Sequence, residues 1–245
     1  MISRIGCQRT SLLATSLMPK PTAAKTAVSS KRQALSDTTA NQILDAAEAL
    51  FAAHGYGGTS MRAIAERANA NLGAFHYYWG SKQALCKAVL ERRLGPVMKE
   101  RKERLDAFEG RKVPLRDILR ASMAPSLLVA GASVEERESF RAFYGRMLMD
   151  PADEVHALTA SIVDDFARRF VDVVSHELPH LSSEEFYWRV IFVYGAFFYA
   201  HSTHTRVQAL WPEKLQQTSM EAGVDFLVSF IEAGLKAKPA PRSAG

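Results

Sequence analysis

Apolar residues recur along most of this chain with the spacing of an α-helix. In residues 38–54 they fall at positions i, i+4, i+7 and i+8 of one amphipathic stripe: Ile43, Ala47, Leu50 and Phe51. A second stripe of the same kind follows in residues 61–68, and no segment shows the strict alternation of a β-strand. The pattern predicts an all-α protein with about nine helices.

Glycines, prolines and capping residues indicate where these helices begin and end. The stretch HGYGG (54–58) ends the first helix, and Thr59 is expected to cap the second. After the turn NAN (69–71), Asn71 caps a short third helix, and Ser81 caps a long fourth helix to about Phe108. The starts of the fifth to ninth helices are expected at Pro114, Ser133 with Glu136, Asp150-Pro151, Ser182 with Glu185, and Pro212.

The net charge of +5 is concentrated at the N-terminus. Residues 1–36 contain six Lys and Arg and no Asp or Glu, with many Ser, Thr and Ala, so we expect a disordered basic tail over residues 1–37. An organelle transit peptide has a similar composition, and translation from Met18 is a further alternative. Residues 237–245 are expected to form a second disordered tail.

Two further features of the composition limit the class of protein. The cysteines Cys7 and Cys86 are too few for a disulfide framework, which favours a reducing compartment. The longest apolar run, VIFVYGAFFYA (190–200), is eleven residues, whereas a membrane span needs about 20. We therefore expect no association with a membrane.

The third helix has an unusual outer face. Phe75, Tyr78 and Trp79 point to one side and can pack inward, which leaves the outer face to four residues: Gly73, Ala74, His76 and Tyr77. A glycine inside a helix costs about 1 kcal/mol, and close approach to another surface would compensate for it. The first turn contains no carboxylate, so the positive end of the helix dipole is available to a phosphate.

The fourth helix begins with a comparable feature. Lys82 lies in its first turn, where the helix dipole favours an anion, and an external phosphate would resolve this conflict. A solvated Lys82, together with a Gly73 that merely relieves a crowded contact, is the alternative interpretation. The occurrence of the feature at two adjacent helix starts favours nucleic acid.

A short helix, a three-residue turn and an exposed helix together describe a helix-turn-helix. The stretch ILDAAEALFAAHGYGGTSMRAIAERANANLGAFHYYWGSKQAL resembles the DNA-binding domain of the tetracycline-repressor (TetR) family. The resemblance covers about fifty residues and includes the apolar first helix, HGY, TSMRAIA and the recognition helix in the family's order. The sequence differs from the family at His76, because the usual Tyr-His-Tyr-Phe reads His76-Tyr77-Tyr78-Trp79 here.

The resemblance implies a homodimeric regulator of the bacterial cytoplasm and nucleoid. It would be a repressor that binds a near-palindromic operator in double-stranded DNA and is released by a small-molecule effector. A helix-turn-helix domain would span residues 38–95, and a ligand-binding and dimerisation domain residues 96–236. The resemblance assigns DNA contacts to Ser60, Arg62, Asn71, Leu72, Gly73, Ala74, His76, Tyr77 and Lys82.

The C-terminal half carries two hypotheses of its own. A pliable effector pocket could be lined by Met123, Phe143, Tyr144 and Met147, although residues at this spacing are commonly plain core. The eighth and ninth helices have apolar surfaces too wide for one domain, which favours a four-helix contact between two copies. The interface would include Tyr194, Phe198, Phe226 and Phe230, and an unusually apolar internal core is the alternative.

Rival classes of protein lack support in the sequence. It contains no nucleophile elbow, phosphate loop or zinc signature, so we expect no catalytic residue, no cofactor and no enzyme. His201 and His204 have the spacing of a metal pair, but no carboxylate or Cys joins them, so we expect no metal. Residues 37–95 contain six Lys and Arg against five Asp and Glu, which is too little charge for a non-specific DNA-coating protein.

Overall fold

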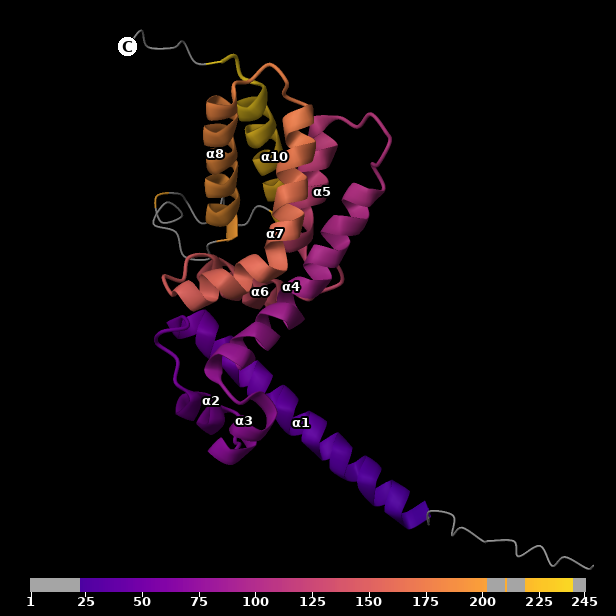
Figure 1. The fold of residues 1–245 in the computed structure, drawn as a ribbon, viewed down its shortest axis with the longest axis vertical. Helices are drawn as coiled ribbons and strands as arrows, with labels where there is room; N and C mark the ends of the chain where they lie inside the picture. The colour runs from indigo at the N-terminus through magenta and orange to yellow at the C-terminus, as the bar shows by residue number, and fades with distance from the viewer. Residues whose placement is uncertain (1–22, 202–209, 211–218, 240–245) are drawn as a thin grey trace, which may run out of the picture. The chain divides into compact units, whose positions relative to one another are not determined.

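The fold is known from a computed structural model, which describes residues 23–201, residue 210 and residues 219–239. Within these ranges the chain forms nine α-helices and no strand, which confirms the all-α prediction (Figure 1). The helices are α1 (Ala23–His54), α2 (Met61–Arg67), α3 (Leu72–Trp79), α4 (Lys82–Asp106), α5 (Leu115–Leu128), α6 (Val134–Leu148), α7 (Asp153–His176), α8 (Ser183–His201) and α10 (Met220–Lys236).

The chain divides into two compact units, residues 1–38 and residues 39–245. In residues 23–37 the structure has a helix where the sequence pattern predicted a disordered tail. This segment contains neither Gly nor Pro, and extending a helix that has already formed costs less than starting a new one. The rest of the predicted basic tail, residues 1–22, lies outside the described residues.

The first three helices and the start of α4 share a small apolar core. Its centre consists of side chains that are fully buried: Ile43, Phe51, Ile64, Phe75 and Leu85. These residues come from α1, α2, α3 and the start of α4, so each helix contributes one face to the same core. Packing on this core fixes α2 and α3, which are too short to be stable alone.

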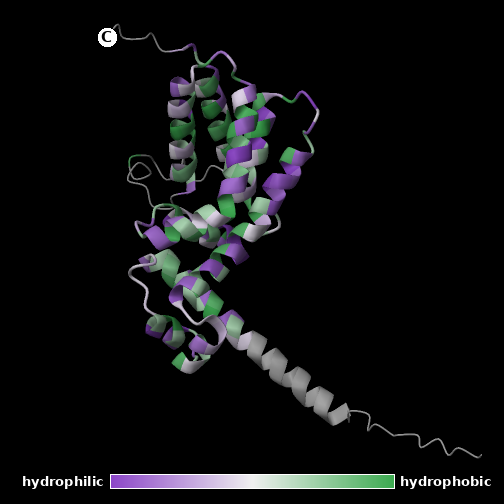
Figure 2. Ribbon diagram, viewed as in Figure 1, coloured by the Kyte–Doolittle hydropathy of each residue, from purple (hydrophilic) through white to green (hydrophobic). Residues whose placement is uncertain are grey.

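The remaining helices form the larger part of the second unit. α4 packs against α5 and α7, α5 packs against α10, and α8 contacts both α6 and α10. Each of these helices carries both hydrophobic and hydrophilic residues along its length, as expected for amphipathic helices around a shared core (Figure 2). None of the helices in the described ranges combines the length and the apolar content of a membrane span.

Most of the expected helix starts are present. Pro114 precedes α5, and Ser133 with Glu136 forms the predicted capping box of α6, through hydrogen bonds of 3.2 and 2.7 Å. The cap of α2 is Ser60, however, because the Thr59 hydroxyl is buried and donates to the carbonyl groups of Leu50 and Gly55.

The last helix also begins at a different place. α10 starts at Met220, and Oγ of Ser219 accepts a hydrogen bond from the N–H of Ala222 (3.2 Å). The expected start at Pro212 falls in residues 211–218, which lie outside the described residues. The serine cap satisfies one of the free N–H groups of the first turn, which is why the helix can begin there.

Candidate nucleic-acid interface and ligand cavity

The turn between α2 and α3 is held by side-chain caps at both helix starts. Oγ of Ser60 accepts a hydrogen bond from the N–H of Ala63 (3.1 Å), and Oδ1 of Asn71 accepts one from the N–H of Ala74 (2.7 Å). Asn69, inside the turn, has a φ of +50°, a region in which Asn is more common than other non-glycine residues. The two helices therefore keep a fixed relative direction, as a helix-turn-helix requires.

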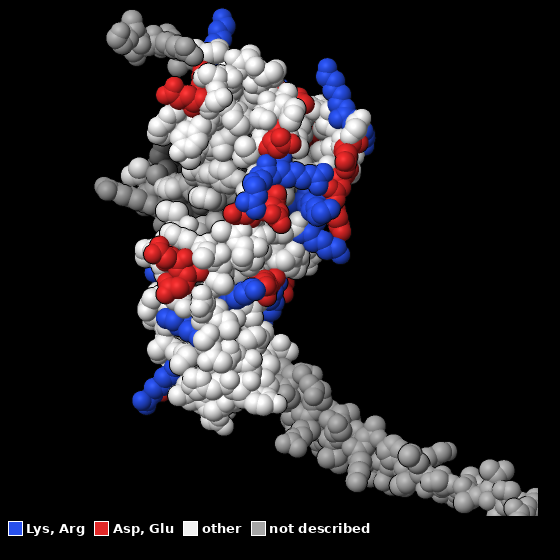
Figure 3. Space-filling model, viewed as in Figure 1, with Lys and Arg blue, Asp and Glu red and all other residues white. Residues whose placement is uncertain are grey.

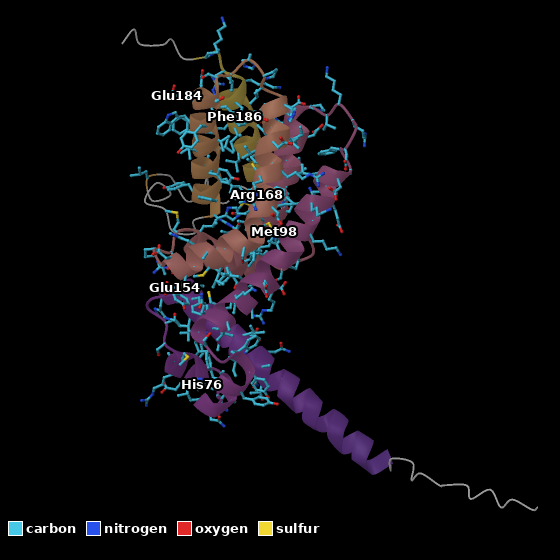
Figure 4. The ribbon with its side chains drawn as sticks, in the orientation of Figure 1. His76, Met98, Glu154, Arg168, Glu184 and Phe186 are labelled. Atoms are coloured by element: carbon cyan, nitrogen blue, oxygen red, sulfur yellow. The ribbon has the colours of Figure 1, made fainter. Side chains whose placement is uncertain are left out.

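The side chains of α3 divide between core and surface as the sequence predicted. Phe75 is fully buried, and Tyr78 and Trp79 are half-buried against the core. On the other side, Tyr77 is 81% exposed, and Figure 4 shows His76 projecting from α3. Leu72 and Gly73 are exposed as well, so the start of α3 is accessible to a partner.

Gly73 is exposed and lies beside the capping side chain of Asn71. A Cβ atom built on it would meet Oδ1 of Asn71 at 3.2 Å and no other described atom within 4 Å. This one contact is tight, so a side chain at Gly73 would press on the capping oxygen of Asn71, and no other described atom would crowd it. Close approach of an external surface stays a prediction for a glycine that weakens this short helix.

Lys82 is not the unpaired cation that its position in the sequence suggested. Its Nζ donates hydrogen bonds to the carbonyl oxygens of Tyr56 (3.0 Å) and Thr59 (3.1 Å), and it lies 4.1 Å from the centroid of the Tyr56 ring. An ammonium group has three donors, so one remains after these two bonds. Lys82 thus ties the start of α4 to the loop between α1 and α2, and contact with a phosphate stays a prediction.

The charged surface around α2 and α3 is modest. Nε of Arg62 lies 2.9 Å from Oε1 of Glu66, and both side chains are mostly exposed. On the face shown in Figure 3, the surface of this region is mostly uncharged, with a few Lys and Arg at its edge. The first turns of α3 and α4 contain no acidic residue. A phosphate would meet free N–H groups there without repulsion from a carboxylate.

The C-terminal helices contact the same loop through Asp150, which is 3% exposed. Its Oδ2 accepts a hydrogen bond from the N–H of Tyr56 (2.7 Å), and its Oδ1 accepts one from the N–H of Ala152 (3.1 Å). Gly55 has a φ of +71°, and a Cβ atom there would lie 3.0 Å from Oδ2 of Asp150. A side chain at Gly55 would therefore be strained and would press on Asp150. Sequence reasoning missed the contact between Asp150 and Tyr56, because these residues are 94 positions apart.

Cys86 lies in the same region and is chemically inert. Its side chain is fully buried, and burial, together with the charge of Asp150, raises the pKa of the thiol to about 12 although Lys82 acts in the opposite direction. The thiolate is the reactive form of cysteine, so Cys86 serves as an apolar core residue.

A cavity of about 70 Å³ lies among the C-terminal helices. Its wall consists of Arg101, Ser122, Met123, Tyr144, Leu148, Val163, Phe166, Ala167, Phe170, Val193, Tyr194, Phe197 and Phe198. Of the four predicted pocket residues, Met123 and Tyr144 belong to the wall, whereas Phe143 and Met147 are buried in the core outside it. On α6 the cavity meets the face that carries Tyr144 and Leu148, four residues apart, and Phe143 and Met147 share the adjacent face.

The expected dimer residues also separate into two groups. Tyr194 and Phe198 of α8 are half-buried in the cavity wall, whereas Phe226 and Phe230 of α10 are 68% and 71% exposed. The assignment of all four to a dimer interface stays a prediction. The outer side of α8 has its own exposed apolar residues: Tyr187, Trp188, Ile191, Phe192 and Tyr199. We refer to these five residues with Phe226 and Phe230 as the outer aromatic surface. It lies on two helices that contact each other.

Only one histidine of the pair lies in the described residues. His201 is fully buried, with Nδ1 2.9 Å from the carbonyl oxygen of Phe197 and Nε2 3.1 Å from Oγ of Ser126. His204 lies outside the described residues, within which no group of three or more His, Cys, Asp and Glu could hold a metal ion. Both ring nitrogens of His201 are thus engaged inside the protein.

Two family descriptions match different parts of the chain. Residues 43–89 match the family described as bacterial regulatory proteins, tetR family, and residues 120–234 match the tetracyclin repressor-like C-terminal domain. The chain matches none of the curated protein sequences with which it was compared.

Several solved structures have a similar fold, and each match covers nearly the whole of the solved chain. A TetR-like transcriptional regulator from Rhodococcus sp. RHA1 is 24% identical, with 82% of this chain and 97% of that chain covered and a TM-score of 0.57. The ketosteroid transcriptional regulator KstR2 of Mycobacterium tuberculosis is 14% identical, with 80% and 93% covered and a TM-score of 0.56. The regulator FadR from Bacillus subtilis, solved in complex with stearoyl-CoA, is 16% identical, with 79% and 97% covered and a TM-score of 0.56.

The two family matches lie on the two parts that the helices define, one on the helix-turn-helix and one on the helices around the cavity. The fold agrees with that of the similar solved regulators over about four-fifths of the chain. The chain belongs to the tetracycline-repressor (TetR) family, whose members are transcription regulators and not enzymes.

Proposed function

We propose that this protein is a homodimeric repressor of the bacterial cytoplasm that binds a near-palindromic operator and releases it when a small molecule enters the cavity. The exposed start of α3 carries the proposal, because it combines the small, exposed Gly73 with the accessible rings of His76 and Tyr77. A helix presented in this way, after a capped turn, fits the major groove of B-DNA. Residues 38–95 would bind DNA, and residues 96–236 would bind the ligand and the second copy.

The proposed DNA contacts divide into positioning and reading contacts. Contacts to phosphates are assigned to Ser60, Arg62 and Lys82, which lie at or near helix starts, and such contacts fix the register without selecting a sequence. Contacts in the groove are assigned to Asn71, Leu72, Gly73, Ala74, His76 and Tyr77. Since Oδ1 of Asn71 is occupied as a cap, its side-chain N–H groups are the part available to DNA.

The outer aromatic surface supports the dimer. Exposed aromatic residues of this size on two neighbouring helices are typical of a surface that a partner covers. A second copy of the chain would cover it through a two-fold four-helix contact of α8 and α10 with the same helices of its partner. Two-fold symmetry would place the two α3 helices about 34 Å apart, which is one turn of DNA.

The contact of Asp150 supports a route for release. Leu148 lies in the cavity wall, and Asp150, two residues further along the chain, binds the N–H of Tyr56 in the loop before α2. Lys82 binds the carbonyl oxygen of the same residue. A ligand that displaces the end of α6 would therefore shift the loop on which α2 and α3 depend.

Selection of DNA fragments from a random pool by the purified protein tests this function. We expect a two-fold sequence with half-sites about one helical turn apart. Gly73→Leu should abolish the selection without lowering the melting temperature, because its side chain would fill the space kept for the groove while leucine favours a helix more than glycine does. Ala157→Leu is the control, since Ala157 is exposed on α7 and adds the same side chain to a helix outside the proposed DNA-binding domain. Recovery of random sequence by the unmodified protein would contradict the proposal.

A further inference from the structure

Arg101 places a positive charge in the wall of the cavity, and only 3% of this residue is exposed. One Nη atom donates a hydrogen bond to Oγ of Ser126 (2.7 Å), and the other lies 3.9 Å from Sδ of Met98, one turn earlier on α4 (labelled in Figure 4). Nε has no hydrogen-bond partner among the described residues. A guanidinium group has five N–H donors, so Arg101 retains unused donors beside the cavity.

The surroundings of Arg101 do not supply a balancing charge. Its guanidinium carbon lies 5.1 and 5.2 Å from the ring centroids of Phe166 and Phe197. In the described part of the chain no carboxylate pairs with it, since Asp106 of α4 pairs with Lys102 and Arg169, and Asp164 of α7 pairs with Arg168. A buried cation without an anion is unfavourable, so the protein either tolerates this cost or offsets it with a ligand.

His201 holds Arg101 in place without adding charge. Burial lowers the pKa of His201 to about 4, and the positive charges of Arg101 and Arg141 act in the same direction, so the ring is neutral at neutral pH. Because a carbonyl oxygen can only accept, Nδ1 carries the proton toward Phe197, and Nε2 accepts from the hydroxyl of Ser126. The oxygen of Ser126 then accepts from Arg101, which fixes the guanidinium in position.

We propose that the cavity binds a small carboxylic acid as its carboxylate, and that Arg101 is the residue that pairs with it. This inference rests on the proposed function, because the acid would be the effector that releases the DNA. A carboxylate matches the planar donor pattern of a guanidinium group and would restore charge neutrality inside the protein.

The rest of the cavity limits the size and charge of this acid. Most of its wall is apolar, with Val163, Phe170 and Val193 among its residues, so the body of the ligand is hydrocarbon. Arg101 is the one charged residue in the described wall, which matches a single negative charge better than a phosphate dianion. The volume of about 70 Å³ is roughly half that of a cavity known to hold benzene, so the body is compact.

Two further side chains of the wall suit such a ligand. The flexible thioether of Met123 can move to accommodate its body. Burial raises the pKa of the Tyr194 hydroxyl, although Arg101 acts in the opposite direction, so Tyr194 stays a neutral donor and does not compete as an anion. The wall therefore offers donors to a carboxylate at one place and apolar surface to its body elsewhere.

Binding of matched probes to the purified full chain tests the proposal. The probes are propanoate and isobutyrate, which suit a compact cavity, with propanamide and isobutyramide as counterparts that keep the shape and lack the charge. By calorimetry, we expect the carboxylates to bind at least about tenfold more tightly, as expected for a hydrogen-bonded ion pair. Arg101→Met should remove this preference, and Arg168→Met, an exposed arginine of α7, should preserve it.

Two readouts separate a ligand-binding role from a structural one. If Arg101 is kept for a ligand, Arg101→Met should melt at the same temperature as the unmodified protein or higher, because an unpaired buried charge has been removed. The preference of the unmodified protein for carboxylates over amides is measured independently of any variant. Should Arg101→Met fail to fold, Arg101→Lys keeps the charge, loses the fork and should bind the carboxylates more weakly.

The proposal is wrong if the unmodified protein binds carboxylate and amide equally, if it binds none of the four probes at millimolar concentration, or if Arg101→Met keeps the preference. The same experiments distinguish a failure of the proposed carboxylate site from a failure of the proposed repressor function. A protein that selects an operator and shows no preference for carboxylates refutes this inference alone. A protein that prefers carboxylates and selects no DNA sequence refutes the proposed repressor and leaves the acid site in place.

Discussion

Asp150→Ala is the sharpest test of the contact between the cavity-bearing helices and the loop before α2. The carboxylate of Asp150 is almost fully buried and accepts two backbone hydrogen bonds, from Tyr56 at 2.7 Å and from Ala152 at 3.1 Å. Alanine removes both acceptors. The N–H of Tyr56 then loses its acceptor at a buried position.

The expected loss of stability follows from these two bonds. A hydrogen bond to a charged acceptor contributes about 1.5 to 3 kcal/mol, so the loss of two should lower the free energy of unfolding by about 3 to 6 kcal/mol. For a chain of this size, each kcal/mol corresponds to roughly 2 to 4 °C in melting temperature, which gives a fall of about 6 to 24 °C. Asp150→Asn should lose about half as much, because its amide oxygen can still accept from the N–H of Tyr56.

Differential scanning calorimetry at neutral pH measures the effect. Asp165→Ala is the matched control, since the side chain of Asp165 is 100% exposed and pairs only with Arg168 on the same helix. Its melting temperature should equal that of the unmodified protein. If Asp150→Ala melts together with this control, the contact does not form in solution and the proposed route from cavity to loop is wrong.

Three further predictions concern other parts of the protein. Lys82→Ala should weaken binding to operator and random DNA by similar factors and lower the salt slope by about one unit, as filter binding at several salt concentrations would show. Phe230→Glu should give monomers in sedimentation and weaken operator binding, because it buries a charge in the outer aromatic surface. His201→Asn should reduce the loss of stability in acid. The pKa of His201 is about 4 in the folded protein and 6.5 in the unfolded chain, so below pH 6.5 the unfolded chain binds a proton that the folded protein does not. The unmodified protein should therefore lose about 2 kcal/mol of stability between neutral pH and pH 5 through this residue.

Each of these predictions has a result that would contradict it. If Lys82→Ala binds operator and random DNA as tightly as the unmodified protein does, Lys82 contacts no phosphate and only holds the loop before α2. A dimer formed by Phe230→Glu, or a monomer formed by the unmodified protein at micromolar concentration, would remove the proposed interface. Equal melting temperatures for His201→Asn and the unmodified protein at pH 5, after agreement at pH 7, would show that the ring titrates normally.

The parts of the fold that depend on local spacing could be predicted from the sequence. The inward side of α3 follows from its helical period, and the capping box of α6 follows from Ser133 and Glu136, three residues apart. Such features involve neighbours along one helix, so the sequence contains all the information they need. The start of α1 at Ala23 was missed for a related reason, because a helix once formed extends through residues that show no apolar stripe.

The parts of the site that depend on distant partners could not be predicted in this way. The helical period shows that Tyr194 and Phe198 share one face of α8, but it does not show whether that face meets a cavity or a second copy. Lys82 looked unpaired because its partners, the carbonyl groups of Tyr56 and Thr59, belong to the backbone of another segment. A backbone acceptor leaves no signal in the residue types, and only the fold brings it to the lysine.

Arg101 and Lys82 lie on the same helix, and this arrangement bears on how a ligand could act on DNA binding. They are separated along α4 by about 28 Å, since each residue of a helix advances the chain by about 1.5 Å. Gly95 and Pro96 lie between them, and a proline inside a helix removes one backbone hydrogen bond, so α4 has a point at which it can bend. A displacement at the cavity end of α4 that is carried past this point would reach the loop before α2 through Lys82. α4 and the Asp150 contact therefore provide two connections from one cavity to the same loop. A ligand that pulls on Arg101 while displacing the end of α6 would strain both connections together, and release of the DNA would then require no unfolding of α3.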